Sequence, residues 1–121
     1  IETPFDKNDL TSDPIRYKRT QRLVRKKPSI RLWGTTNAWV KTVKNSLIKI
    51  RKKEWYKKIK TPICIINPIN DRVVYHEKTK EMAKNLYNCK IVNIKNCQHE
   101  ILMEKDDLRY QFWKIFDSFT N

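Results

Sequence analysis

A single glycine, Gly34, is the feature that most restricts what this 121-residue chain can fold into. A dinucleotide-binding Gly-x-Gly-x-x-Gly loop, a Walker-type phosphate loop and a Gly-x-Ser-x-Gly nucleophile elbow each need more than one glycine close together. Collagen-like repeats and glycine-serine linkers need many more. The chain therefore contains none of these glycine-rich motifs, repeats or linkers.

Positive charge is concentrated in the first half of the chain. Residues 1–60 carry 18 Lys and Arg against five acidic residues, whereas residues 61–121 carry nine against eight. The whole chain has a formal net charge of +14. This asymmetry predicts two segments with different roles. No apolar run is long enough to cross a bilayer, so we predict no membrane span.

The three cysteines Cys64, Cys89 and Cys97 form no short pairing pattern. Their odd number, and the position of Cys64 inside an apolar run, favour reduced thiols in a reducing compartment. Zinc binding by Cys89, Cys97 and His99 is an alternative, but the spacing is not that of common zinc sites and no fourth ligand is evident. We therefore expect no metal, no cofactor and a cytoplasmic location.

Residues 1–60 read as helical. Thr11-Ser12-Asp13-Pro14 is typical of a helix start, because a side-chain oxygen can cap the first amides and proline suits the first turn. We predict helices over residues 14–27 and 36–53, with a loop at 28–35 and a short turn at 54–56. In the second helix, apolar residues recur at helical spacing among lysines.

In residues 61–121 the spacing of apolar residues differs from the helical spacing of the first half. The apolar run at 62–66 is typical of a strand buried on both faces of a parallel sheet. A helix over 77–87, a second strand over 90–94 and a helix over 106–119 are predicted to follow. Strand, helix, strand, helix indicates an α/β fold with a right-handed βαβα unit. Its last helix has a wide apolar face.

Two polar residues follow the predicted strands. Asp71 comes five positions after the first strand and His99 five after the second. Because sites in open α/β sheets gather at the carboxyl ends of strands, these residues are candidates for the orienting half of a nucleophilic triad. The alternative is that Asp71 caps a turn and His99 is an ordinary loop histidine.

Several strings resemble a known family. Thr61-Pro-Ile-Cys-Ile-Ile-Asn-Pro-Ile-Asn-Asp71-Arg-Val-Val and Cys97-Gln-His-Glu-Ile-Leu-Met-Glu104 are similar to the acid and histidine motifs of α/β-hydrolases. Leu10-Thr-Ser-Asp-Pro-Ile-Arg-Tyr17 and the stretch from Pro28 to Trp39 resemble the helical lid of bacterial lysophospholipases in the monoacylglycerol-lipase and serine-aminopeptidase-like branch. The resemblance extends in order over nearly the whole chain.

The resemblance implies a C-terminal part of an α/β-hydrolase, with a basic lid at 1–60 and a βαβα core at 61–121. Asp71 would be the triad acid and His99 the general base. Ser12, Ser29, Ser46 and Ser118 lack the two-glycine elbow, so the nucleophile is expected upstream, in a missing N-terminal half. The intact enzyme would cleave esters of lysophospholipids or monoacylglycerols, whereas this chain alone would be inactive.

The basic half allows several interpretations. A lysine-rich solvated surface is one. Contact with an anionic membrane, such as a peripheral contact at the inner membrane, is another, made by the basic residues with help from Trp33, Trp39 and Trp55. A nucleic-acid-binding module is the alternative function, because aromatic residues are interleaved with the charge. No nucleic-acid-binding motif is present, so we expect a lipid ester and no nucleic acid. A non-catalytic hydrolase remnant is the third reading.

Overall fold

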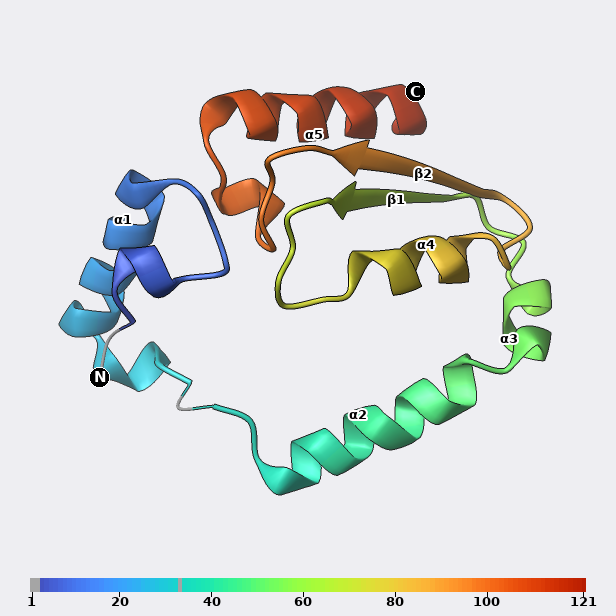
Figure 1. Ribbon diagram of the computed structural model, residues 1–121, viewed down its shortest axis with the longest axis horizontal. Helices are drawn as coiled ribbons and strands as arrows, with labels where there is room; N and C mark the ends of the chain where they lie inside the picture. The colour runs from blue at the N-terminus through green and yellow to red at the C-terminus, as the bar shows by residue number, and fades with distance from the viewer. Residues whose placement is uncertain (1–2, 33) are drawn as a thin grey trace.

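The computed structural model describes residues 3–32 and 34–121 of the chain. In chain order the elements are η1 (Phe5–Lys7), α1 (Pro14–Lys26), η2 (Pro28–Ile30), α2 (Asn37–Ile50), α3 (Lys53–Lys58), β1 (Ile63–Pro68), α4 (His76–Ala83), β2 (Cys89–Ile94), η3 (Ile101–Met103) and α5 (Asp106–Thr120). Figure 1 shows the sheet and its helices on one side of the molecule, with α1, α2 and α3 arranged around them.

The helical half begins as its capping residues predict. Asp13 accepts hydrogen bonds from the amides of Ile15 and Arg16 and starts α1. The Thr36 hydroxyl accepts one from the amide of Trp39 and starts α2. Helix α2 ends at Ile50, three residues before the predicted end. The predicted turn at 54–56 is wrong, because these residues lie inside the separate helix α3.

Strands β1 and β2 form a parallel pair, as predicted, with Ile63 opposite Cys89 and Pro68 opposite Ile94. Strand β1 is half-buried along most of its length rather than buried on both faces. The reason is that the described residues form a sheet of only two strands. Inside it, the Asn67 amide donates a 2.9 Å hydrogen bond to the Asn93 side-chain oxygen, so this polar pair is satisfied within the sheet.

Helices α4 and α5 cover opposite faces of the two strands (Figure 1). Helix α4 ends at Ala83 rather than near residue 87. Its last residues give way to a turn in which the amides of Asn85 and Leu86 bond to the carbonyls of Met82 and Ala83. The turn returns the chain to β2, and this completes the predicted β-α-β connection.

The core lies between the sheet and α5. Ile94, Cys97 and Leu108 are its buried members, and four partly buried side chains pack against them: Ile66, Ile101, Phe112 and Ile115. Only part of the apolar face predicted for the last helix is therefore packed against the core. Phe116 and Phe119, farther along α5, remain exposed by 44% and 38%.

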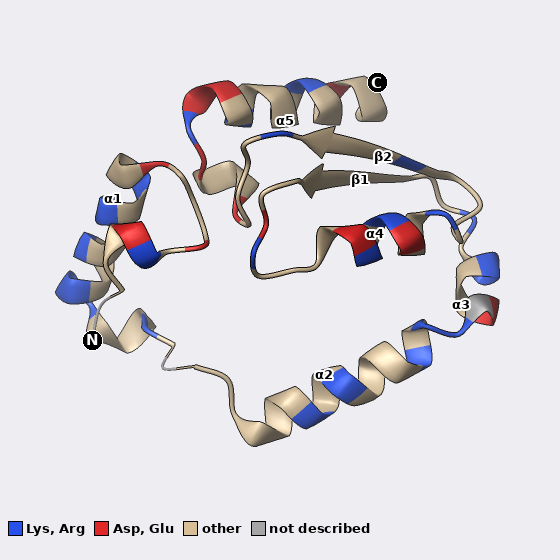
Figure 2. Cartoon of the chain, viewed as in Figure 1, with Lys and Arg blue, Asp and Glu red and all other residues tan. Residues whose placement is uncertain are grey.

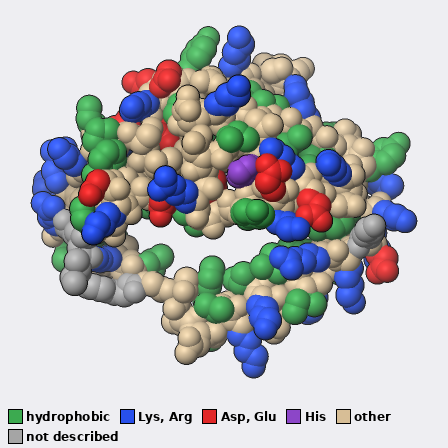
Figure 3. Space-filling model, viewed as in Figure 1, with side chains coloured by type: hydrophobic (Ala, Val, Ile, Leu, Met, Phe, Trp, Pro, Cys, Tyr) green, Lys and Arg blue, Asp and Glu red, His purple; other side chains and the backbone are tan. Residues whose placement is uncertain are grey.

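Helix α2 lies apart from this core. Of its residues, all of them described, none is buried. Figure 3 shows an opening between α2 and the sheet layer, with hydrophobic side chains on its borders. Lys and Arg are spread over α1, α2 and α3, whereas α4 carries both basic and acidic residues and α5 begins with acidic ones (Figure 2). No helix within the described ranges is long and apolar enough to cross a membrane.

Candidate functional site

Asp71 lies in the turn that follows β1. One of its carboxylate oxygens, Oδ1, accepts hydrogen bonds from the amides of Val73 and Val74 at 2.8 and 2.9 Å. The side chain is only 6% exposed. Burial alone would raise the pKa of Asp71, but the hydrogen bonds from His99, Val74 and Val73 outweigh it and lower the pKa. The carboxylate is therefore held ionised with its second oxygen, Oδ2, available to another partner.

His99 is that partner. Its Nδ1 lies 2.9 Å from Oδ2 of Asp71, and its side chain is 32% exposed. Parallel pairing brings the two residues together, because both strands end at the same edge of the sheet. The two loops are also joined by their backbones, from Ile69 to Ile94 and from Asn70 to Cys97, each at 3.0 Å. The two candidate residues predicted from the sequence are thus in direct contact.

The geometry has a clear chemical consequence. A carboxylate at Nδ1 favours the imidazole tautomer that carries its proton there, and this tautomer is assigned from the contact. Nε2 is then the ring nitrogen suited to take a proton from a nucleophile and to return it later. A carboxylate in this position would also stabilise the imidazolium formed by such a proton transfer.

The metal alternative has no support in the described part of the chain, where no three side chains of the metal-binding types gather. Cys97 is fully buried beside the candidate pair. Burial raises the pKa of its thiol to about 12, and the negative charges of Glu104 and Asp71 add to the effect. Since metals and electrophiles react with the thiolate, this cysteine behaves as an apolar core residue.

One feature of the site was not predicted from the sequence. The segment Leu10–Arg16 is hydrogen-bonded to the loop Cys97–Glu104, which carries His99. Both segments belong to strings that resemble the hydrolase family, so the sequence did indicate that each segment matters. Their contact could not be predicted, because the bonded residues are up to 92 positions apart.

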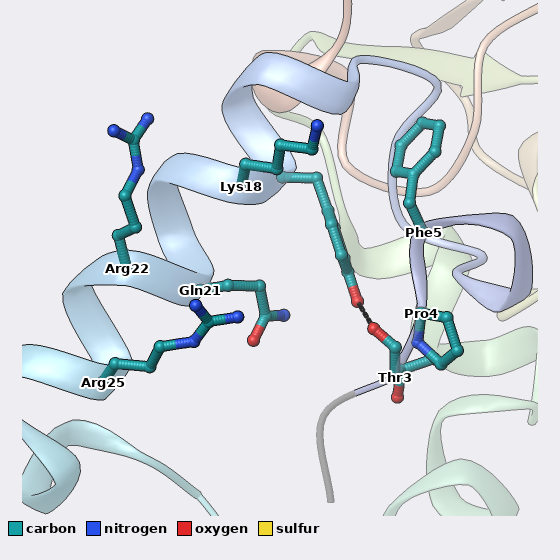
Figure 4. A pocket seen from close by; sticks show the side chains of 8 residues that line it. Thr3, Pro4, Phe5, Lys18, Gln21, Arg22 and Arg25 are labelled. Carbon is teal, nitrogen blue, oxygen red and sulfur yellow. Dashed lines mark hydrogen bonds between the residues drawn. The ribbon is translucent and has the colours of Figure 1, made fainter.

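Two cavities lie away from the pair. The larger, of about 640 Å³, lies between the N-terminal segment and α1, and its lining includes Lys18, Arg22 and Arg25 from α1 and Thr3, Pro4 and Phe5 from the N-terminal segment (Figure 4). The Tyr17 hydroxyl donates a hydrogen bond to the Thr3 carbonyl across it. The second, of about 360 Å³, is an apolar groove between β1 and α5. Asp71 and His99 line neither of these two cavities.

Comparison with known proteins decides the family. Residues 2–106 match the family described as "Serine aminopeptidase, S33". The chain belongs to this α/β-hydrolase family. Its sequence is 32% identical over 114 residues to a probable lysophospholipase L2 of Haemophilus influenzae. That match covers 94% of this chain and 36% of the relative.

The fold of this chain is also found in a solved structure. A soluble variant of monoglyceride lipase from Saccharomyces cerevisiae, in complex with a substrate analogue, superimposes with a TM-score of 0.70 at 16% sequence identity. The superposition covers 98% of this chain and 42% of that lipase. The α/β fold predicted from the sequence is confirmed as a portion of an α/β-hydrolase. The chain thus spans less than half the length of the two proteins it matches.

Proposed function

We propose that this chain contributes Asp71 and His99 to the Ser-His-Asp triad of a serine hydrolase. The observation that carries the proposal is the 2.9 Å contact between Nδ1 of His99 and Oδ2 of Asp71, in a chain of a serine hydrolase family. His99 acts as general base and Asp71 orients it. The nucleophilic serine and its oxyanion hole come from polypeptide outside this chain.

The proposed substrates are carboxylic esters of lysophospholipids or monoacylglycerols. The names of the two similar proteins, a probable lysophospholipase and a monoglyceride lipase, support this class. So does the exposed apolar surface of α2, where Trp39, Leu47 and Ile50 are 55%, 41% and 47% exposed. An acyl chain would cover such a surface. In the reaction, His99 takes the serine proton, the serine oxygen bonds to the ester carbonyl, and the alcohol leaves with that proton.

The domain division follows from this proposal. Residues 1–60 act as a basic lid over the substrate, and residues 61–121 supply the catalytic edge of the core. The structure adds a qualification, because Leu10–Arg16 bonds to the histidine loop. The part of residues 1–60 that moves as a lid is then α2 and α3, which leaves α1 anchored at its start. Trp33 and the side chain of Lys53, both assigned to the lid, lie outside what the structure describes.

The test is hydrolysis of a short acyl ester by a full-length protein that contains this chain. His99→Ala is expected to lower kcat by about 10⁴-fold or more, since the serine loses its base. His76→Ala is the matched control, because His76 contacts Glu77 on α4 and not Asp71. Circular dichroism establishes that both variants fold. Retained activity in a folded His99→Ala protein would reject the assignment.

A further inference from the structure

The side chain of Glu104 is the most enclosed carboxylate next to the candidate triad pair. It is 0% exposed. Its Oε1 accepts a hydrogen bond from the amide of Gln98 at 2.7 Å. Its Oε2 accepts two from Ser12, at 3.0 Å from the amide and 2.5 Å from the hydroxyl. A buried carboxylate is costly unless it is hydrogen-bonded, so these donors are what allow it to remain there.

The hydrogen-bond partners of Glu104 come from two segments that are far apart in the sequence. Gln98 directly precedes His99, and Ser12 lies 92 residues from Glu104, in the segment that starts α1. The same segment makes further bonds to the histidine loop, from the Thr11 hydroxyl to the Met103 carbonyl at 2.7 Å and from Arg16 to the Glu104 carbonyl at 2.9 Å. Glu104 is therefore the side chain through which Leu10–Arg16 reaches the residue before His99.

His99 is held on both sides as a result. The amide of Gln98 bonds to Glu104, and the amide of Glu100 bonds to the Leu10 carbonyl at 2.8 Å. These two amide bonds add to the short helix η3 (Ile101–Met103) and fix the backbone on either side of His99 to distant parts of the chain. The orientation of the imidazole toward Asp71 depends on the backbone that these two amide bonds fix.

We propose that Glu104 is a positioning residue for His99, acting with Ser12 to hold the histidine loop in the geometry that the triad needs. The inference rests on the proposed function, in which His99 is the general base. It adds a role for the Leu10–Arg16 segment, which anchors the start of the lid to the catalytic loop. Any displacement of that segment would be transmitted to His99 through Glu104.

The hydrogen-bond donors around residue 104 explain why a carboxylate is suited to this position. All three groups that face it are donors, two amides and one hydroxyl. A carboxylate has only acceptor oxygens, whereas a glutamine of almost the same volume must turn an NH₂ group toward at least one donor. Glu104→Gln therefore changes the hydrogen bonds and leaves the packing nearly intact.

Steady-state hydrolysis of a short acyl ester by the full-length protein tests this role. Glu104→Gln is expected to lower kcat by about 10- to 100-fold with little change in KM, because small misplacement of a catalytic group has effects of this size. Ser12→Ala keeps both amide donors and is expected to lose less, about threefold to tenfold. Asp107→Asn, an equal change at an exposed position three residues later, is the matched control and should leave kcat unchanged.

A spectroscopic readout separates positioning from loss of stability. With ¹⁵N-labelled histidine, the Nδ1 proton bonded to Asp71 gives a downfield resonance in the wild type, and Glu104→Gln should broaden or shift it at a temperature where the protein is fully folded. Unchanged kcat in folded Glu104→Gln, or a lowered kcat with an unchanged resonance, would overturn the proposal. If Glu104→Gln does not fold, Ser12→Ala decides by the same two readouts. Failure of the proposed function is recognised separately, by activity that survives His99→Ala.

Discussion

At the scale of single residues, enclosed carboxylates organise the two loops of the site. Asp71 and Glu104 each accept backbone amide bonds, and each also bonds to a side chain from a distant part of the chain. Hydrogen bonds to charged groups are stronger than those between neutral groups, and a buried charge without them is destabilising. The pKa of Asp71 is lowered in the folded chain, so the ionisation of this residue is coupled to folding.

Replacing Asp71 with asparagine should make stability less dependent on pH. The pKa of Asp71 is lowered in the folded chain, so the ionised form stabilises the fold. This contribution is complete above the pKa of the unfolded chain, about 3.9. It is lost as the pH falls through the lower pKa of the folded state. We expect Asp71→Asn to lower the free energy of unfolding by about 1 kcal/mol at pH 7 and by less at pH 2.5.

Urea unfolding followed by tryptophan fluorescence at submicromolar concentration measures this difference. Asp117→Asn, at an exposed position in α5, should cost little at either pH. An equal loss of stability for Asp71→Asn at pH 7 and pH 2.5 would contradict the expected role of its charge.

At the scale of elements, the start of α1 links local capping to tertiary structure. Asp13 caps the helix with one carboxylate oxygen and bonds to Arg16 with the other. Arg16 extends from the helix to Asp106 at 2.6 Å and to the Glu104 carbonyl at 2.9 Å. Pro14 occupies the first turn, where a missing amide proton costs nothing. The cap therefore sets both the start of α1 and the direction of the arginine that holds α5.

Removal of this cap should loosen the first turn of α1 and the adjoining loop. Asp13→Ala is expected to cost about 1 kcal/mol, the usual value for a lost N-cap, or more because of the Arg16 contact. Hydrogen exchange measured by mass spectrometry should show faster exchange in peptides that cover residues 13–17 and 100–106. Asp107→Ala, which removes an exposed acid from the first turn of α5, is the control. Unaltered exchange at 100–106 in Asp13→Ala would show that the cap acts only locally.

At the scale of the whole molecule, the sheet has an edge that the described residues leave unpaired. Strand β1 pairs with β2 alone among the described strands. Beside it is the apolar groove lined by Cys64, Ile66, Ile101, Phe112, Phe116 and Phe119. A free strand edge next to apolar side chains is a site for association. In the proposed full-length hydrolase, further strands and helices cover this edge and groove.

The isolated chain should therefore self-associate. Sedimentation velocity on the 121-residue chain at tens of micromolar is expected to show species larger than a monomer. Phe116→Lys, at the groove, should reduce the association, whereas Tyr110→Lys, 69% exposed elsewhere on α5, should not. A monomer with a single cooperative thermal transition would contradict the expectation.

The basic half predicts a second property of the whole molecule, which is attraction to anionic surfaces. Lys41 and Lys44 lie exposed on α2. Basic residues near an anionic membrane contribute about 1 kcal/mol each, so Lys41→Ala with Lys44→Ala should weaken binding to phosphatidylserine-containing vesicles by about 30-fold. A matched pair, Lys90→Ala with Lys114→Ala in the second half, should have a smaller effect. Equal binding by the two double variants in a vesicle flotation assay would argue against a membrane role for α2.

The sequence by itself determined the elements and the candidate pair. Helix starts at Pro14 and Asn37, both strands and the last helix follow from caps and periodicity, which act over a few residues. Asp71 and His99 could be found because parallel strands place their carboxyl ends at one edge. The predictions that were wrong concern the ends of α2 and α4, the turn at 54–56 and the burial of β1. These are boundaries and packing, which depend on neighbouring residues in the fold.

Only the tertiary structure decided how the site is held together. The bonds from Ser12 and Gln98 to Glu104 join residues that no local pattern relates. The sequence does not distinguish Glu104 from a surface glutamate. Its burial depends on hydrogen-bond donors from a segment 92 positions away. The lone glycine, Gly34, excluded a nucleophile elbow from this chain. What the chain does contain is the contact between Asp71 and His99, and long-range hydrogen bonds, not local propensity, fix the geometry of the loop that carries His99.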